Sequence, residues 1–311
     1  MSTPTRRLFL TGLALAIAGS VLFSAKAIVV KLAYRHGVDA ATLIALRMLF
    51  SVPFFALALA WSSRGSPPLA RSDHVRLIVI GLLGYYAASY LDFLGLQYIT
   101  AALERLILYL NPTIVLLMSA LLLGKRFSRR EIAALALAYG GILLVFLHDV
   151  RLEGEGVPLG AALVFGSAVC YAAYLVMSGE LVRRVGAIRL TSYAMCVSTV
   201  AVFAQFLIVN PLASLQQPAP VYWLSLVNGV LCTVLPVFAT MLAVERIGAG
   251  RTSLAAMVGP VATIALAYLF LDERVSGWQL AGTTLVLSGV YVLSRSSTAS
   301  AIARSVSKEN S

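Results

Sequence analysis

Ionisable side chains inside long apolar stretches are the residues of this 311-residue chain most able to carry chemistry. A charge within a bilayer costs about 2.5–3.5 kcal/mol on insertion scales, so residues that retain one commonly serve a function. Two acids and four bases of this kind are present: Lys26, Lys31, Arg47, Asp92, Glu104 and Arg105. When all are ionised, this group is net positive and attracts a carboxylate, while Asp92 or Glu104 can hold an amine or a proton.

These charges also have structural alternatives. Asp92 and Lys26 can form a buried pair that never meets a substrate, and Lys31 lies near a helix end, from which its ammonium can reach the membrane interface. Arg47 can anchor a substrate or be tethered to an acid. Glu104 and the arginine that follows it lie about 100° apart on a helix, so each needs a partner on another helix or water.

The composition identifies the class of protein. The chain is 60% hydrophobic and 12% charged, whereas a soluble domain carries about 25% charge. Apolar stretches of about 20 residues, the length that crosses about 30 Å of hydrocarbon, recur along the chain. The net charge of +11 lies mostly in short loops between them, so it indicates topology rather than nucleic-acid binding. The sequence predicts an all-α polytopic membrane protein.

Ten transmembrane helices are expected. Their approximate bounds are 8–33, 40–61, 75–98, 100–123, 130–147, 157–178, 190–210, 219–244, 248–271 and 277–294. They give a first five-helix repeat over 1–147, a periplasmic connecting loop over 148–156, a second five-helix repeat over 157–294, and a Ser-rich cytoplasmic tail over 295–311 that is expected to be disordered.

The two halves also match in sequence. Residues 99–141 align with 247–289 at a shift of 148, which pairs Pro112 with Pro260. Because each half has an odd number of spans, the second half must be inverted relative to the first. The segment GKRFSRRE holds four basic residues, whereas its counterpart DERVSGWQ holds one, as expected if the two lie on opposite sides of the membrane.

The loop charges predict the orientation. With the N-terminus in the cytoplasm, most loop Lys and Arg residues lie inside, and those outside are Arg35, Arg151 and Arg274. We therefore expect a multi-pass protein of the bacterial inner membrane with both termini cytoplasmic. Arg6 and Arg7 before an apolar run resemble an export signal, but that run has a counterpart in the sixth span, so we expect it to be retained as the first helix.

The charges of the first half are expected at a similar depth. At 1.5 Å per residue, Lys26, Arg47, Asp92 and the Glu104–Arg105 pair lie within about 5–11 Å of the outer boundary. The matching positions of the second half are uncharged: Ala173, Ser178, Ala194, Thr240, Thr252 and Ser253. This difference predicts one asymmetric polar site in the outer half of the membrane.

Uncharged residues can complete this site. Tyr86 in the third span can hold apolar parts of a substrate, and Asn111 and Asn228 can line this polar site. Helix packing and interhelical hydrogen bonding are their structural alternatives. Pro112 and Pro260 each leave a backbone carbonyl without its helical donor, so we expect an equivalent bend in the two helices. Such a pair of bends can serve as hinges when the two halves rock against each other.

Several segments carry a resemblance to a known family. They are FSAKAIVVKLA, LGLQYITAALERLILYLNP and LLLGKRFSRRE in the first half, and AVERIGAGRTSLAAMVGPVATIALAYLFLDERVSGWQ in the second. Over about residues 8–294 the chain resembles the EamA type of the drug/metabolite transporter superfamily. The resemblance implies export of amino acids or other small metabolites by alternating access around a central cavity. Lys125 stands where the family often has an acidic residue, and we attribute it to topology.

The sequence therefore predicts a secondary transporter, not an enzyme, that exports a small polar metabolite such as an amino acid. The chain has no P-loop motif, and its His and Cys residues lack metal-site spacing, so no cofactor and no metal are expected. The expected partners are a small-molecule substrate and the lipid bilayer, with no nucleic acid. Proton coupling and the oligomeric state stay open. The alternatives are a non-transporting membrane scaffold and an intramembrane or lipid-handling protein.

Overall fold

The computed structural model describes residues 3–64, 66–123, 129–153, 155–247, 252 and 255–292, and within these residues the secondary structure is helical with no strand. The first half contains α1 (Thr3–Tyr34), α2 (Ala40–Ser63), α3 (Arg71–Gly81), η1 (Leu82–Ala87), α4 (Ala88–Gly95), α5 (Ala101–Leu108), α6 (Asn111–Leu123) and α7 (Arg129–Glu153). The second half contains α8 (Gly156–Val185), α9 (Ala187–Val209), η2 (Leu212–Leu215), α10 (Ala219–Gly229), η3 (Val230–Val234), α11 (Leu235–Ile247), η4 (Ala256–Val258), α13 (Gly259–Leu271) and a helix over 277–292.

Six helices in the described part of the chain are long and apolar enough to cross a membrane: Phe9–Tyr34, Ala40–Ser63, Arg71–Gly95, Gly156–Gly179, Ala187–Val209 and Ala219–Ala243. Shorter apolar helices cover Ile132–His148 and Gly259–Leu271. These spans agree with the polytopic all-α class.

Two expected boundaries differ from the structure. The span expected over 100–123 is not one helix, because the chain leaves the α-helix between α5 and α6. Helix α7 continues to Glu153, so the connection to α8 is shorter than the loop expected over 148–156. The tail expected over 295–311 and the loop that holds Lys125 lie outside the described residues.

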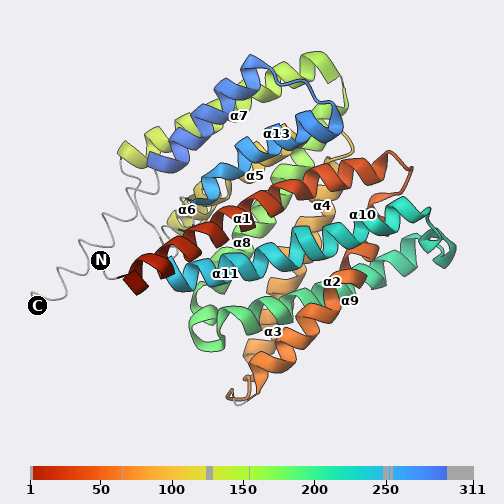
Figure 1. The fold of residues 1–311 in the computed structure, drawn as a ribbon, viewed down its shortest axis with the longest axis vertical. Helices are drawn as coiled ribbons and strands as arrows, with labels where there is room; N and C mark the ends of the chain where they lie inside the picture. The colour runs from red at the N-terminus through yellow and green to blue at the C-terminus, as the bar shows by residue number, and fades with distance from the viewer. Residues whose placement is uncertain are drawn as a thin grey trace, which may run out of the picture.

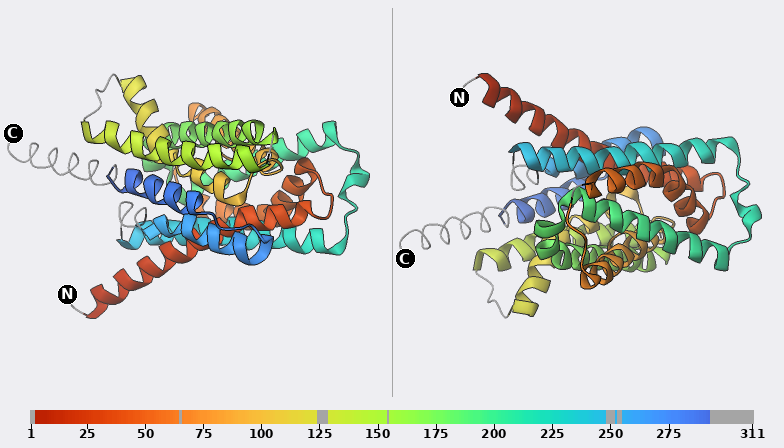
Figure 2. Two further views of the ribbon diagram at one scale, coloured as in Figure 1. Left: turned by 90° about the horizontal axis from the view of Figure 1, so that it is seen from above. Right: turned by 90° about the horizontal axis from the view of Figure 1, so that it is seen from below.

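The helices form one bundle (Figure 1). The α1–α2 turn and η2 lie at one end of the bundle, which we call the α1–α2 end, and α1 begins at the opposite end (Figure 2). At the α1–α2 end, Asn210 Nδ2 donates a hydrogen bond to Asp39 Oδ2 at 3.2 Å.

In α1 and α2, burial is concentrated toward the α1–α2 end. Val30 near the end of α1 is buried and Leu10 near its start is exposed, whereas in α2, which runs the opposite way, Leu43 is buried and Leu57 is exposed. The largest apolar cluster includes the last turns of α1 and the first turns of α2. Helices α1 and α2 therefore pack against the rest of the bundle mainly near the α1–α2 end.

Two π-helical segments lie at matching positions of the two halves. Segments η1 and η3 begin at residues 82 and 230 and are each preceded by a glycine, Gly81 or Gly229. A Cβ atom at Gly81 would lie 2.8 Å from the Ala194 carbonyl oxygen, and one at Gly229 would lie 2.8 Å from the Arg47 carbonyl oxygen. Both glycines thus allow a π-segment to pack directly on the backbone of a helix from the other half.

Helix α7 meets the helix over 277–292 through a second pair of glycine contacts (Figure 1). A Cβ atom at Gly141 would lie 2.6 Å from the Gly282 carbonyl oxygen, and one at Gly289 would lie 2.6 Å from the Ala134 carbonyl oxygen. Small residues permit this close approach of helices where lipid offers no hydrophobic drive for association.

Candidate functional site

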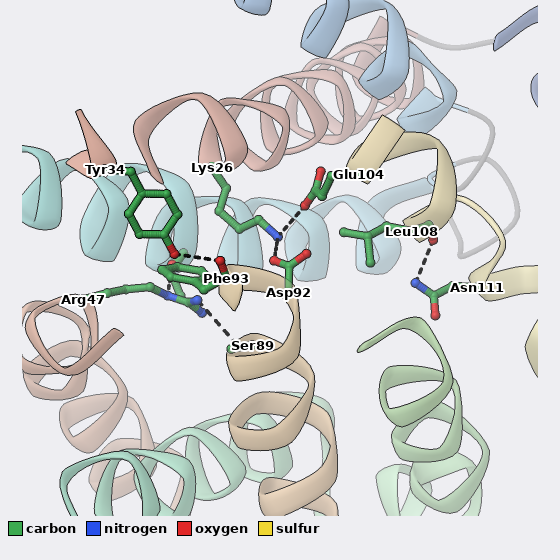
Figure 3. Close-up of polar contacts among 10 residues, drawn as sticks. Lys26, Tyr34, Arg47, Ser89, Asp92, Phe93, Glu104, Leu108 and Asn111 are labelled. Carbon is green, nitrogen blue, oxygen red and sulfur yellow. Dashed lines mark hydrogen bonds and ion pairs between the residues drawn. The ribbon is translucent and has the colours of Figure 1, made fainter. Parts of the chain in front are cut away.

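Three of the predicted charges meet inside the bundle. Lys26 on α1 places its Nζ atom 2.5 Å from Asp92 Oδ2 on α4 and 3.1 Å from Glu104 Oε1 on α5 (Figure 3). The side chains of these residues are 14%, 4% and 1% exposed, respectively. We call Lys26, Asp92 and Glu104 the charged triad. It joins three helices with two carboxylates and one ammonium group.

The carboxylates of the triad keep unused hydrogen-bonding capacity. Asp92 Oδ1 and both carboxylate oxygens of Glu104 are buried and accept no hydrogen bond from the described residues. Lys26 Nζ lies within ion-pair distance of Glu104 Oε1, but this contact lacks hydrogen-bond geometry. A buried oxygen without a donor is costly, so these atoms are suited to bind a proton or an ammonium group.

Arg47 contacts other residues instead of the triad. Its Nε donates a hydrogen bond to Thr233 Oγ1 at 3.1 Å, and its Nη1 lies 3.5 Å from Ser89 Oγ. The guanidinium carbon lies 5.3 Å from the centre of the Phe93 ring (Figure 3). Thr233 Oγ1 in turn donates to the Asn228 carbonyl at 2.8 Å. Arg47 therefore connects α2 to α4 and to the π-segment η3, through neutral partners rather than through an acid.

Arg105, Asn228 and Tyr86 are three further predicted site residues. The Arg105 guanidinium carbon lies 5.3 Å from the centre of the Tyr109 ring, and its Nε is buried without an acceptor among the described residues. Asn228 is fully buried, and neither atom of its amide group has a partner there. Tyr86 lies on η1, half-buried against the largest apolar cluster.

The first predicted hinge proline follows a break between α5 and α6. Proline has no N–H group, so Pro112 cannot bond to the Leu108 carbonyl four residues earlier. The Asn111 side chain replaces this donor, with its Nδ2 atom 2.7 Å from the Leu108 carbonyl oxygen (Figure 3). The position of Asn111 is thus explained by a local cap at the break.

The second proline has different donors. Pro260 leaves the Ala256 carbonyl without its helical partner. Ser20 Oγ donates a hydrogen bond to this carbonyl at 2.7 Å. The Tyr109 hydroxyl donates a second hydrogen bond to it. Gly259, which matches Asn111 in the repeat, has no side chain that could donate a hydrogen bond to the freed carbonyl. A Cβ atom there would lie 2.5 Å from the Tyr109 hydroxyl oxygen and 2.9 Å from Ser20 Oγ. The two breaks are therefore built differently.

Sequence reasoning missed the hydroxyl groups that complete these contacts: Ser20, Ser89, Tyr109 and Thr233. A signal for two of them was present. A proline inside a span releases a carbonyl that must find a donor within the bundle, so a search for buried hydroxyls near each proline would have identified Ser20 and Tyr109. Nothing comparable in the sequence indicated Thr233.

Within the ranges that the structure describes, no three or more His, Cys, Asp and Glu side chains are grouped so that they can hold a metal ion.

Comparison with known proteins decides the family. The EamA-like transporter family matches the chain twice, at residues 10–147 and 158–295. The chain belongs to the EamA-like transporter family. It is therefore a transporter and not an enzyme, and its apolar helices make it a multi-pass membrane protein.

Its relatives agree with this assignment. The uncharacterised transporter YcbK of Bacillus subtilis (strain 168) is 31% identical over 274 residues, which cover 85% of this chain and 86% of that protein. A probable amino-acid metabolite efflux pump of Escherichia coli (strain K12) is 25% identical over 62% of this chain and 67% of its own length. A solved crystal structure, 19% identical, has the same fold with a TM-score of 0.62 over 90% of this chain and 94% of that one.

Proposed function

We propose that this EamA-like transporter exports a small metabolite that carries an amine, such as an amino acid, in exchange for a proton. The charged triad is the observation that carries the proposal. The efflux pump relative, which is named for amino-acid metabolites, supports the substrate class.

The triad provides one place for either of two cations. Two carboxylates face one ammonium group, so a single added positive charge balances the buried cluster. A proton and the ammonium group of a substrate would both bind to the oxygens of Asp92 and Glu104 that accept no hydrogen bond from the described residues. Because the two cations exclude each other, release of one accompanies binding of the other. Arg105, next to Glu104 in sequence, offers an unpaired Nε to the substrate carboxylate.

Alternating access has three supports. The family matches the chain twice at the same offset, from 10 to 158 and from 147 to 295, which fits two five-helix repeats among ten spans. The two π-segments and their glycines occupy matching positions, as expected for inverted halves. The burial of the last turns of α1 and the first turns of α2 fits a state closed at that end. Pro112 and Pro260, each after a helix break, are proposed as the hinges.

The proposed location is the bacterial inner membrane with both termini in the cytoplasm. The support is the distribution of Lys and Arg in the sequence, since cytoplasmic loops carry the excess of these residues. In this orientation the α1–α2 end faces the periplasm, and the closed end is the exit for an exported substrate.

Transport by the purified protein in liposomes tests the proposal. Liposomes with a more acidic interior and labelled amino acids outside should accumulate one or more of these compounds only while the pH difference lasts. Asp92→Asn and Glu104→Gln should each reduce the initial rate at least tenfold (about 1.4 kcal/mol). Glu155→Gln, a change at an exposed acid outside the triad, serves as the matched control and should transport like the wild type.

Two results would contradict the proposal. Accumulation by Asp92→Asn and Glu104→Gln with an unchanged dependence on the pH difference would remove the triad from the coupling step. Absence of transport for every amine-bearing compound, in a protein that retains its fold, would remove the substrate class.

A further inference from the structure

A further ion pair, separate from the charged triad, lies near the α1–α2 end. Lys31 Nζ lies 3.0 Å from Glu273 Oε1 and donates to the Ile99 carbonyl at 2.9 Å, while the Ala101 N–H group donates to the same carboxylate oxygen at 3.3 Å. Three segments meet here: the last turn of α1, the start of α5 and the chain after α13. Lys31 is thus joined to the second half of the chain rather than extended to the membrane interface.

The Glu273 carboxylate is only partly used in this contact. Its Oε2 atom is buried and accepts no hydrogen bond from the described residues. The side chains of Lys31 and Glu273 are 25% and 17% exposed, so both are accessible to water from the α1–α2 end. The pair can therefore separate without moving two fully buried charges.

A cavity of about 360 Å³ lies against Lys31 of this pair. Its wall consists of Lys31, Tyr34, Gly37, Val38, Asp39, Leu96 and Gln97. The acid of the cavity is already engaged, because Asp39 accepts hydrogen bonds from the Thr42 N–H group at 3.0 Å, the Thr42 hydroxyl at 2.5 Å and Asn210 at 3.2 Å. The Tyr34 hydroxyl donates to the Phe93 carbonyl at 2.7 Å. Lys31 is therefore the charged group with which this cavity can bind a ligand.

We propose that this cavity is an exit site for a substrate carboxylate, which replaces Glu273 as the partner of Lys31 and so opens the α1–α2 end. Exchange of one carboxylate for another keeps the Lys31 ammonium paired throughout, and the displaced Glu273 carboxylate, 17% exposed in the closed pair, passes into water rather than staying buried without a partner. A compound without a carboxylate offers no such replacement and leaves the Lys31–Glu273 pair closed. The role of this site in export rests on the proposed function. Under that function the triad selects substrates that carry an amine, and the exit site then selects those that also carry a carboxylate.

The sequence makes this device specific to one end. In the repeat, Glu273 matches Lys125 at a shift of 148, and Lys31 matches Ser178 at a shift of 147. The matching positions hold a lysine and a serine, so they cannot form an acid–base pair at the other end. A substrate carboxylate would act on the barrier at the α1–α2 end alone.

Binding to the purified protein in detergent tests the site without need of transport. The probes are L-alanine and L-alaninamide, which differ in the carboxylate, and the readout is thermal stabilisation as a function of probe concentration. In Glu273→Gln the probe no longer competes with a carboxylate for Lys31. We expect L-alanine to reach half-maximal stabilisation at a concentration at least tenfold lower than in the wild type, and L-alaninamide to show no such gain.

Control variants determine whether the gain arises from Lys31 and its exchange of carboxylates. Asp272→Asn removes a neighbouring exposed acid at a backbone position with φ of 60° that Asn tolerates, and it should show no gain. Lys31→Gln combined with Glu273→Gln should abolish the gain, whereas Asp92→Asn combined with Glu273→Gln should retain it. A gain that survives Lys31→Gln, appears in Asp272→Asn or extends to L-alaninamide would overturn the proposal, as would no gain at all in Glu273→Gln.

The two proposals can fail separately. If liposomes show no transport while Glu273→Gln gains affinity through Lys31, the proposed function is wrong and the carboxylate site stands. If transport depends on the triad while Glu273→Gln shows no gain, the exit site is wrong and the proposed function stands.

Discussion

Removal of the Lys26 ammonium should destabilise the protein strongly. Lys26→Met keeps an unbranched side chain of similar length but leaves Asp92 and Glu104, 4% and 1% exposed, without the cation that lies 2.5 and 3.1 Å from them. Breaking a buried ion pair by removal of one partner costs about 3–5 kcal/mol, because the remaining charge is uncompensated. Here one substitution exposes two carboxylates to this penalty, so we expect a loss of at least about 3 kcal/mol in the free energy of unfolding.

The measurement is equilibrium unfolding of the purified protein in mixed detergent micelles, followed by circular dichroism. Lys31→Met in the same helix is the matched control, and its more exposed pair should cost about 1 kcal/mol. The triple variant Lys26→Met/Asp92→Asn/Glu104→Gln, which removes all three charges, should recover most of the lost stability. A cost for Lys26→Met of no more than about 1 kcal/mol, or no recovery in the triple variant, would refute the view that the triad is a buried, mutually compensating cluster.

Three further substitutions test the contacts around the π-segment and the helix break. Gly229→Ala should destabilise the protein, because its Cβ would lie 2.8 Å from the Arg47 carbonyl oxygen, whereas Gly140→Ala, with nothing within 4 Å, should not change the unfolding midpoint measurably. Thr233→Val should cost about 1–3 kcal/mol in the same unfolding assay, since it removes the acceptor of the Arg47 Nε bond. Asn111→Ala should cost a similar amount, about 1–3 kcal/mol, because the carbonyl at the break loses its donor; unchanged stability in either variant would show that water replaces the lost group.

The class of the protein and most of its spans were predictable because hydropathy and charge are properties of consecutive residues. A stretch such as Ala40–Ser63 must satisfy its backbone within a helix when it lies in lipid, whatever surrounds it. The break in the span expected over 100–123 was less accessible, since a proline inside an apolar run can either bend a helix or divide it. The structure divides it, with Asn111 as the local donor.

The sequence predicted which residues form the candidate site, but not which of them contact each other. The sequence identified Lys26 and Asp92 as a candidate pair and indicated that Glu104 needed a partner on another helix. The structure places all three together. For Arg47 the sequence offered a substrate or an acid, and the structure provides Thr233 and Ser89 instead. For Lys31 the interface was one expectation, and the structure provides Glu273, which lies 242 residues away in the chain.

By itself, the sequence determined that the chain is a helical membrane protein and that its two halves are related, and it identified Arg47, Asp92 and Glu104 among the residues that carry buried charge. Only the tertiary structure decided which charges meet. Helices that are apolar on nearly all sides carry little information about which face turns inward, and a side chain can reach a partner only after the rotation and crossing of its helix are fixed. The partners in the pairs Lys26–Asp92 and Lys31–Glu273 lie 66 and 242 residues apart in the chain. Only the packing of the helices brings the charged groups of each pair within hydrogen-bond distance.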